Sequence, residues 1–290
     1  MGLGAIGRPM AARLASRFPL TVWNRTAAIA EAFGRQVPCR VAPSAGDAVA
    51  EADVVVTCLS TSADVDQLLN GPTGIASALR PGSLFLDCTS GDAATSTRLA
   101  SQLATRGIDF ADCPVSGGTN GAEAGVLTVM VGGTAETFAK ARPVLEAFGK
   151  LIVHVGPAGA GDTVKAVNQV LLASNILSLA EALTAMVKAG VPARVGLEVL
   201  NASSGRSFVS ETLIPTRVLN GTWPKTFRLA LMDKDVGIAV DLVHQLGLEA
   251  PLLDQVRERT ATMRRALGEE ADYLEPIKWH ENQSGAEVRG

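Results

Sequence analysis

The sequence has few aromatic residues and no excess of charge of one sign. Aromatic residues make up 4% of the 290-residue chain and hydrophobic residues 47%, which is typical of a globular protein with an aliphatic core. Lysine and arginine number 26 against 29 acidic residues, and the chain has no basic block long enough to follow a phosphate backbone or an anionic membrane. We therefore expect neither nucleic acid nor a membrane as a partner.

Cysteine and histidine are also scarce, with four cysteines and three histidines that occur singly. None has the close spacing of a zinc site or a redox Cys-x-x-Cys motif, so we expect reduced thiols and no metal. The chain does not open with a signal-peptide pattern, and no uninterrupted apolar run approaches the ~20 residues of a membrane-spanning helix. These absences favour a cytoplasmic protein.

Two parts of the chain differ in their pattern. Up to about residue 156, short β-branched runs alternate with helical segments, as in a parallel sheet covered by helices. The expected strands are 20–24, 53–59, 84–88, 109–115, 127–133 and 151–156, with 39–42 as a weaker candidate. We predict an α/β, doubly wound Rossmann domain over residues 1–157, followed by an all-α domain over residues 158–290.

The all-α domain is predicted from helical spacing of apolar residues. This spacing continues without a turn signal over 162–189, which indicates one long helix. Shorter helical patterns follow to about residue 268, with expected breaks at 203–207, 214–218 and 220–227.

The chain opens with MGLGAIGRPM, in which Gly2, Gly4 and Gly7 fit the pattern Gly-x-Gly-x-x-Gly. In a dinucleotide-binding unit this loop follows a strand, and its backbone approaches the pyrophosphate at a helix N-terminus. A helical segment and a strand follow the loop here, but no strand precedes it. We expect about eight upstream residues to supply that strand, and a chain extended by them to bind the cofactor more tightly and unfold at a higher temperature.

Asn24, Arg25 and Thr26 follow the next strand, where the ribose of the cofactor is read. An acidic residue there would accept hydrogen bonds from the ribose of NAD. Arg25 instead offers a bidentate pair to the 2′-phosphate of NADP, and Thr26 offers a hydroxyl and an amide. The alternative is that Arg25 is a solvated residue at a helix start. We favour NADP, with NAD as the alternative cofactor.

Ser116, Gly117 and Gly118 follow another expected strand. They present a hydroxyl and unobstructed amides, which can form a small nest for a substrate carboxylate. The alternative is an ordinary glycine-rich surface loop.

Lys165 and Asn168 lie three residues apart on the long helix and so share one face. Among Val164, Val167 and Leu171 the lysine would be desolvated, which favours its neutral form and lets it exchange a proton with a substrate oxygen. The alternative is a solvated lysine in the first turn of a helix.

Four segments, in order, resemble the β-hydroxyacid dehydrogenase family, which includes 3-hydroxyisobutyrate dehydrogenase, tartronate semialdehyde reductase and glyoxylate reductases. They are GLGAIGRPM (2–10), DCPVSGGTNGAEAGVLTVMVGG (112–133), GAGDTVKAVNQ (159–169) and FRLALMDKDVGIA (227–239). The resemblance implies an enzyme that transfers a hydride between NADP or NAD and a small carboxylate-bearing 3-hydroxy acid or semialdehyde. It also implies a homodimer or homotetramer, paired through the helical domain.

The resemblance assigns a role to each matching residue. Lys165 is the expected general acid and base, Asn168 its orienting partner, and both bind substrate together with Ser116, Gly117 and Gly118. The expected cofactor-binding residues are Gly2, Leu3, Gly4, Ala5, Ile6, Gly7, Asn24, Arg25, Thr26, Leu59, Ser60, Thr89, Ser90 and Lys234.

The chain departs from the family pattern at three places. Gln169 stands where many relatives have a second Asn, Ser60 stands where they often have Pro, and the order of Thr89 and Ser90 is inverted.

Two other functions fit the same architecture. An imine reductase shares the fold, although such enzymes usually lack the catalytic lysine. A non-enzymatic NADP-binding scaffold is the second alternative. Lys165, Asn168 and the Ser-Gly-Gly segment favour the dehydrogenase over both.

Overall fold

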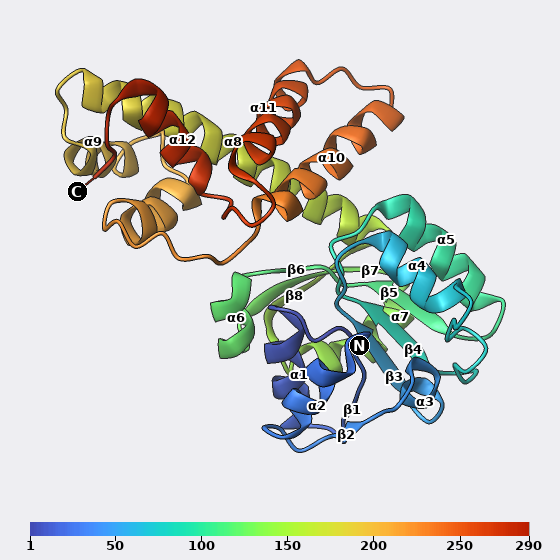
Figure 1. The fold of residues 1–290 in the computed structure, drawn as a ribbon. Coiled ribbons are helices and arrows are strands. Elements are labelled where there is room, and N and C mark those ends of the chain that lie inside the picture. Colours follow the sequence, from blue (N-terminus) through green and yellow to red (C-terminus); the bar gives the residue numbers. More distant parts are fainter. Residues whose placement is uncertain (290) are drawn as a thin grey trace. The chain divides into compact units, whose positions relative to one another are not determined.

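The computed structural model describes residues 1–289 and divides into two compact units, Met1–Ala166 and a second that starts at Val167 (Figure 1). The strands β1 to β8 lie in the first unit. The domain boundary predicted at residue 157 falls just before helix α8 (Ala160–Lys188). The first turns of this helix belong to the first unit and the remainder to the second.

The strands of the first unit form two sheets. Within the described residues they are β1 (Thr21–Val22), β2 (Arg40–Val41), β3 (Val54–Thr57), β4 (Leu84–Asp87), β5 (Asp109–Asp112), β6 (Val115–Ser116), β7 (Leu127–Gly132) and β8 (Gly149–Gly156). β1 and β2 form a parallel pair. The larger sheet has the order β3-β4-β5-β7-β6, with β8 paired to β7.

The larger sheet is mixed, whereas the sequence pattern predicts a parallel sheet. β3, β4 and β5 are parallel, whereas β7 runs antiparallel to both β5 and β6. The run expected as one strand over 109–115 is divided between β5 and β6 at Pro114. Proline has no N–H for the ladder and therefore interrupts a strand at this point.

Met1 and Gly2 lie between the two sheets. The Met1 ammonium donates to the Val56 carbonyl at 2.6 Å, and the Met1 carbonyl accepts from the Cys58 N–H at 3.0 Å. On the other side, the Gly2 N–H donates to the Trp23 carbonyl at 3.3 Å. These residues occupy the position that the sequence predicts for the strand before the glycine loop.

Helices cover both faces of the larger sheet, which confirms the doubly wound architecture (Figure 1). The helices of the first unit are α1 (Gly7–Ala15), α2 (Ala27–Gly34), α3 (Ala45–Val49), α4 (Ser62–Asn70), α5 (Ala93–Ala104), α6 (Gly118–Ala124) and α7 (Ala135–Leu145). Because side chains alternate along a strand, Leu84 and Leu86 pack with α1, α6 and α7. Phe85, on the other face, packs with α3, α4 and α5.

Local sequence fixes where several of these helices begin. Ser44, Thr61, Asp92 and Thr134 precede α3, α4, α5 and α7, and each side chain accepts a hydrogen bond from the backbone N–H three residues later. Such N-cap bonds satisfy donors that the helix itself leaves unpaired.

The second unit is built from helices, as predicted. After α8 come α9 (Ala193–Asn201), the π-helix η1 (Val209–Val218), α10 (Leu229–Gln245), α11 (Pro251–Leu267) and α12 (Glu275–Ser284). The break expected at 214–218 is wrong, because η1 continues through Pro215. A widened π-type turn accommodates a residue that has no N–H to donate.

α8 begins and ends close to the predicted bounds. By length and composition this helix could cross a membrane, contrary to the expectation from the sequence. The core helices of globular proteins satisfy the same criterion, and α8 has a buried face that includes Ala166, Val170 and Ala180.

Candidate functional site

The three glycines of the loop differ in the space around them, which is filled at Gly2 and Gly7 and open at Gly4. Gly2 has φ +85°, and a Cβ there would lie 2.3 Å from the Cys58 carbonyl oxygen. A Cβ on Gly7 would lie 2.0 Å from the Gly2 carbonyl oxygen, whereas a Cβ on Gly4 would meet nothing within 4 Å. Gly2 thus makes the turn, Gly7 lets α1 start against it, and Gly4 leaves the backbone accessible to a ligand. These are the three glycine roles of a dinucleotide loop.

Asn24 joins the glycine loop to the end of β1. Its side-chain oxygen accepts from the Leu3 N–H at 3.0 Å, and its amide nitrogen donates to the Thr26 carbonyl at 3.1 Å. The neighbouring Arg25 side chain is 85% exposed, with Nη1 3.6 Å from Oδ1 of Asp64. A guanidinium at this distance in solvent is held weakly, and Arg25 can therefore turn toward an anion bound beside the loop.

The loops after β3 and β4 are connected through Thr89. Its hydroxyl accepts from the Leu59 N–H at 2.9 Å, and its own N–H donates to Asp87 at 3.0 Å. Thr89 is only 1% exposed, whereas Ser90 is half-buried and Ser60 is exposed. Of the two inverted residues, Thr89 therefore holds the loops together and Ser90 is the more accessible.

Asp87 ends β4 as a buried carboxyl group. Its Oδ1 accepts from the Thr57 hydroxyl at 2.8 Å as well as from the Thr89 N–H. Burial raises the pKa of Asp87 to about 6, and the hydrogen bonds from Thr89 and Thr57 offset only part of that rise.

Two further buried carboxylates hold the start of α8. Asp112, at the end of β5, accepts from the Gly159 N–H at 2.7 Å and from the Asp162 N–H at 2.9 Å. The Asp162 side chain accepts from the Gly91 N–H at 3.0 Å and from the Ser96 hydroxyl at 2.6 Å. The first turn of α8 is thereby tied to β5 and to the segment between β4 and α5.

The charge state of this pair follows from its surroundings. Burial raises the pKa of Asp112, while donation from the backbone N–H groups of Gly159 and Asp162 lowers it. Burial first and the neighbouring Asp112 second raise the pKa of Asp162 well above its usual value. Both oxygens of Asp112 accept from backbone N–H groups, which favours its ionised form. Neither residue was predicted as a site residue from the sequence, although an aspartate at the end of an apolar strand was a usable signal.

Lys165 lies on the buried face of α8 and is 7% exposed. The hydrophobic residues expected to surround it do not do so, because Val164, Val167 and Leu171 are 40%, 43% and 54% exposed. Adjacent helix positions are about 100° apart, so these residues face a different direction from Lys165. The lysine is desolvated as predicted, but it shares its face with the buried Asp162 one turn earlier.

In the second unit, four polar side chains form a connected row. The Asn168 amide donates to Oε1 of Gln169 at 3.1 Å, and Nε2 of Gln169 donates to Asp235 at 2.8 Å. Lys234 lies 2.8 Å from the other oxygen of Asp235. Because a carboxylate only accepts, Asp235 fixes the orientation of Gln169 and, through it, of Asn168. Gln169 and Asp235 were not among the predicted site residues.

Ser116, Gly117 and Gly118 connect β6 to α6. Gly117 has φ +135° and Gly118 φ +65°, conformations that residues with a Cβ rarely adopt. Ser116 is half-buried and Gly118 is exposed. The segment can therefore present backbone amides to a ligand, as the sequence predicts.

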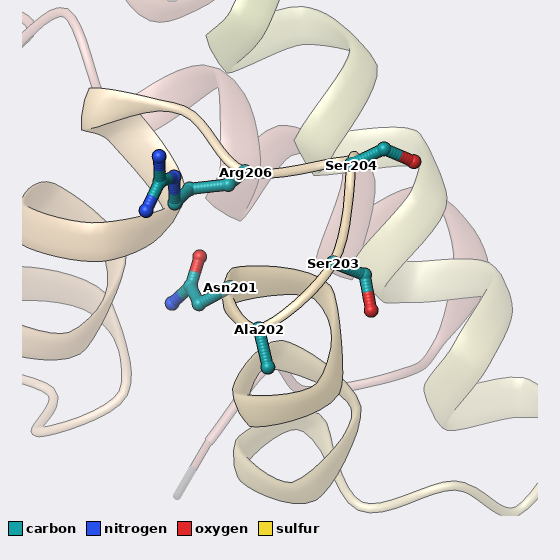
Figure 2. A pocket seen from close by; sticks show the side chains of 5 residues that line it. All are labelled: Asn201, Ala202, Ser203, Ser204 and Arg206. Carbon is teal, nitrogen blue, oxygen red and sulfur yellow. The ribbon is translucent and has the colours of Figure 1, made fainter.

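A pocket of about 480 Å³ lies at the end of α9. It is lined by Asn201, Ala202, Ser203, Ser204 and Arg206. In Figure 2 the Arg206 guanidinium lies on the same side as Asn201, whereas the hydroxyls of Ser203 and Ser204 point the other way. Arg206 also lies 3.7 Å from the Glu211 carboxylate. These polar groups do not converge on one ligand atom.

Substitution by alanine should have different effects at Gly7 and at Gly4. Gly7→Ala should destabilise the protein by about 2 to 4 kcal/mol in urea unfolding, because its Cβ overlaps a backbone oxygen. Gly4→Ala should change stability by less than about 0.5 kcal/mol but weaken binding of NADPH at least about tenfold by fluorescence titration. Equal stability of the two variants would contradict the packing described for Gly7.

Asp87 should make stability depend on pH. Its pKa is about 6 when folded and 3.8 as the reference value, so the unfolded chain releases the proton first as the pH rises. The unfolding free energy should therefore fall by about 3 kcal/mol between about pH 4 and pH 7 because of this group. Asp87→Asn keeps an oxygen for Thr57 and Thr89, and should remove that decrease.

Urea unfolding of both proteins at the two pH values measures the difference, in which other titrating groups cancel. Parallel curves for the wild type and Asp87→Asn would show that Asp87 titrates normally.

Two family models match consecutive parts of the chain. Residues 1–156 match the NAD-binding domain of 6-phosphogluconate dehydrogenase, and residues 159–280 match the NAD-binding domain of NADP-dependent 3-hydroxyisobutyrate dehydrogenase. Together the models cover the first unit, with its glycine loop, and most of the second.

Individual relatives align over nearly the full length. The 2-(hydroxymethyl)glutarate dehydrogenase of Eubacterium barkeri is 36% identical over 100% of this chain and 96% of its own. The NAD-dependent L-serine dehydrogenase of Pseudomonas aeruginosa is 36% identical, with 87% of each chain covered. The 3-hydroxyisobutyrate dehydrogenase of Mycobacterium tuberculosis, solved with L-serine, is 32% identical with a TM-score of 0.88, covering 96% of both chains.

These matches agree with the doubly wound unit, the glycine loop and the helical unit described above. The relatives are dehydrogenases that act on CH–OH groups with NAD or NADP. The chain belongs to the β-hydroxyacid dehydrogenase family and is an NAD(P)-dependent hydroxyacid dehydrogenase.

Proposed function

We propose that the protein oxidises a small 3-hydroxy acid to the corresponding semialdehyde with NADP and catalyses the reverse reduction, with Lys165 as general acid and base. The observation that carries this proposal is the burial of Lys165 on α8, 7% exposed, in the unit that also contains the glycine loop. The substrates named for the relatives are 3-hydroxyisobutyrate, L-serine and 2-(hydroxymethyl)glutarate. Each carries a hydroxyl group on the carbon next to the one that bears the carboxylate.

The proposed chemistry at Lys165 is a proton transfer. When bound, the nicotinamide accepts a hydride from the substrate carbon or returns it. As the C–H bond breaks, the neutral amine of Lys165 takes the hydroxyl proton, and in the reduction its ammonium gives that proton to the carbonyl oxygen. Because Lys165 is buried, it is shielded from bulk water and can exchange its proton with the substrate oxygen.

The other polar groups bind and orient the substrate in this proposal. Asn168 offers its amide to the substrate hydroxyl, and the row through Gln169 to Asp235 sets the direction of that amide. Ser116 and the amides after it bind the substrate carboxylate, which suits a short segment whose glycines have an exposed backbone. Lys234 as a cofactor contact remains a prediction.

The proposed preference for NADP rests on Arg25. Its exposed guanidinium follows β1, where NAD-binding proteins carry an acidic residue that accepts from the ribose. The relatives are divided, since one is NAD-dependent and one matching family model describes NADP-dependent enzymes. A local feature must therefore decide, and a guanidinium favours the 2′-phosphate.

We also propose a homodimer or homotetramer. Val164, Val167 and Leu171 form an exposed apolar row along α8, of a kind that subunit contacts commonly cover. The oligomeric state can be measured by analytical ultracentrifugation.

The experiment that tests the function is a panel of 3-hydroxy acids and semialdehydes, assayed at the nicotinamide absorbance band with NADP and with NAD. We expect turnover of at least one substrate and a kcat/KM at least about tenfold higher with NADP. A protein that binds NADP but turns over none of the panel would instead be a scaffold.

Lys165→Ala should lower kcat by about 100-fold or more, because the proton transfer loses its acid and base. The Kd for NADPH should stay within about threefold of the wild type. Lys140→Ala, which removes an exposed lysine paired with Asp109, is the matched control and should keep full activity. Normal turnover by Lys165→Ala would exclude the proposed mechanism.

A further inference from the structure

Asp162 links two segments that the proposed function uses separately. It lies in the first turn of α8, one turn before Lys165, and is 1% exposed. Its Oδ1 accepts from the Gly91 N–H at 3.0 Å, and its Oδ2 lies 2.6 Å from the Ser96 hydroxyl. Gly91 directly follows Ser90, so one side chain joins the loop after β4 to the helix that carries the lysine.

The packing around this junction is close. A Cβ on Gly159 would lie 2.7 Å from the Ala93 carbonyl oxygen, and one on Gly91 would lie 2.5 Å from the Ser62 hydroxyl. The Thr97 hydroxyl also donates to the Ala158 carbonyl at 3.0 Å. The loop, the start of α5 and the start of α8 are therefore in direct contact within the first unit.

The partners of Asp162 differ in kind from those of Asp112. Asp112 binds two backbone N–H groups, which can only donate, so both of its oxygens must accept. Of the two partners of Asp162, the Gly91 N–H can only donate, but the Ser96 hydroxyl can donate or accept. Both partners are therefore satisfied whether the Asp162 carboxyl group is ionised or neutral. Burial and the nearby Asp112 raise the pKa of Asp162, which agrees with a neutral group.

We infer that Asp162 is a positioning residue that, through its two hydrogen bonds, fixes the loop over 88–92 against the first turn of α8 and so sets the place of Lys165. The inference rests on the proposed function for its effect on turnover. The loop carries Thr89 and Ser90, which we predict to lie near the nicotinamide ribose. A change in its spacing from the lysine alters the geometry of hydride and proton transfer, and such misplacement is costly for rate.

Two substitutions separate this role from a role of the negative charge. Asp162→Asn offers an oxygen to the Gly91 N–H and an N–H to the Ser96 hydroxyl, so both hydrogen bonds can form. Asp162→Ala removes both. Thr134→Ala is the matched control, because it removes an N-cap bond at the start of α7 in the same unit without touching the loop or α8.

Hydrogen exchange of the cofactor-free protein tests the contact directly. In Asp162→Ala, the amides of residues 88–97 should exchange at least about tenfold faster than in the wild type. Asp162→Asn should match the wild type, and Thr134→Ala should change exchange only near α7. Unchanged exchange in Asp162→Ala would overturn the inference.

Turnover supplies the second readout. With the best panel substrate, Asp162→Ala should lower kcat about 10- to 100-fold, with KM for the cofactor within about threefold, and should increase the primary deuterium isotope effect on kcat. Asp162→Asn should retain at least about half of the wild-type kcat. If Asp162→Asn loses as much activity as Asp162→Ala, the group acts through its charge and the inference is wrong.

The two proposals can fail separately. If the wild type turns over no substrate of the panel, the proposed function is wrong and with it the effect on turnover, whereas exchange still decides whether Asp162 holds the loop to α8. If the wild type is active and Asp162→Ala keeps normal exchange and normal kcat, only the inference about Asp162 fails.

Discussion

The start of α8 depends on a buried carboxylate from a neighbouring strand. A helix begins with N–H groups that have no partner within the helix, and Asp112 binds those of Gly159 and Asp162 from the end of β5. The ionised carboxylate also lies near the positive end of the helix dipole. These hydrogen bonds therefore join the larger sheet, through β5, to the helix that contains Lys165. Because this aspartate opens the segment DCPVSGG, the same short stretch of sequence supplies both the anchor and the proposed substrate loop.

Two glycines leave the space that the Asp112 carboxylate occupies. A Cβ on Gly132 would lie 2.4 Å from an oxygen of Asp112, and one on Gly161 would lie 2.7 Å from the other. Such close packing excludes water from around the charge, which makes the remaining hydrogen bonds to Asp112 more important. The glycine loop shows the same principle at Gly2 and Gly7, while the open side at Gly4 is the exception that a ligand requires.

Sequence patterns predicted most of the fold, and the roles assigned to the site residues stay predictions. The apolar runs located the strands, and helical spacing located α8, because both signals arise from burial. The mixed sheet was missed because a strand's direction depends on where the chain reverses, here between β6 and β7. The wrong surroundings of Lys165 came from choosing the nearest apolar neighbours in the sequence, whereas burial is decided by other elements. Gln169, Asp235 and Asp162 were missed as site residues because their roles are hydrogen bonds across long sequence separations.

The most direct test of the central claim is the free energy of unfolding of Asp112→Asn, together with hydrogen exchange at Gly159 and Asp162. An asparagine presents one N–H group to donors that cannot accept, so we expect a loss of about 2 to 3 kcal/mol and faster exchange of both amides. Asp109, half-buried on the same strand and paired with Lys140, is the control, and Asp109→Asn should cost less than about 1 kcal/mol. Unchanged stability and exchange in Asp112→Asn would contradict the claim that an ionised carboxylate holds the start of α8.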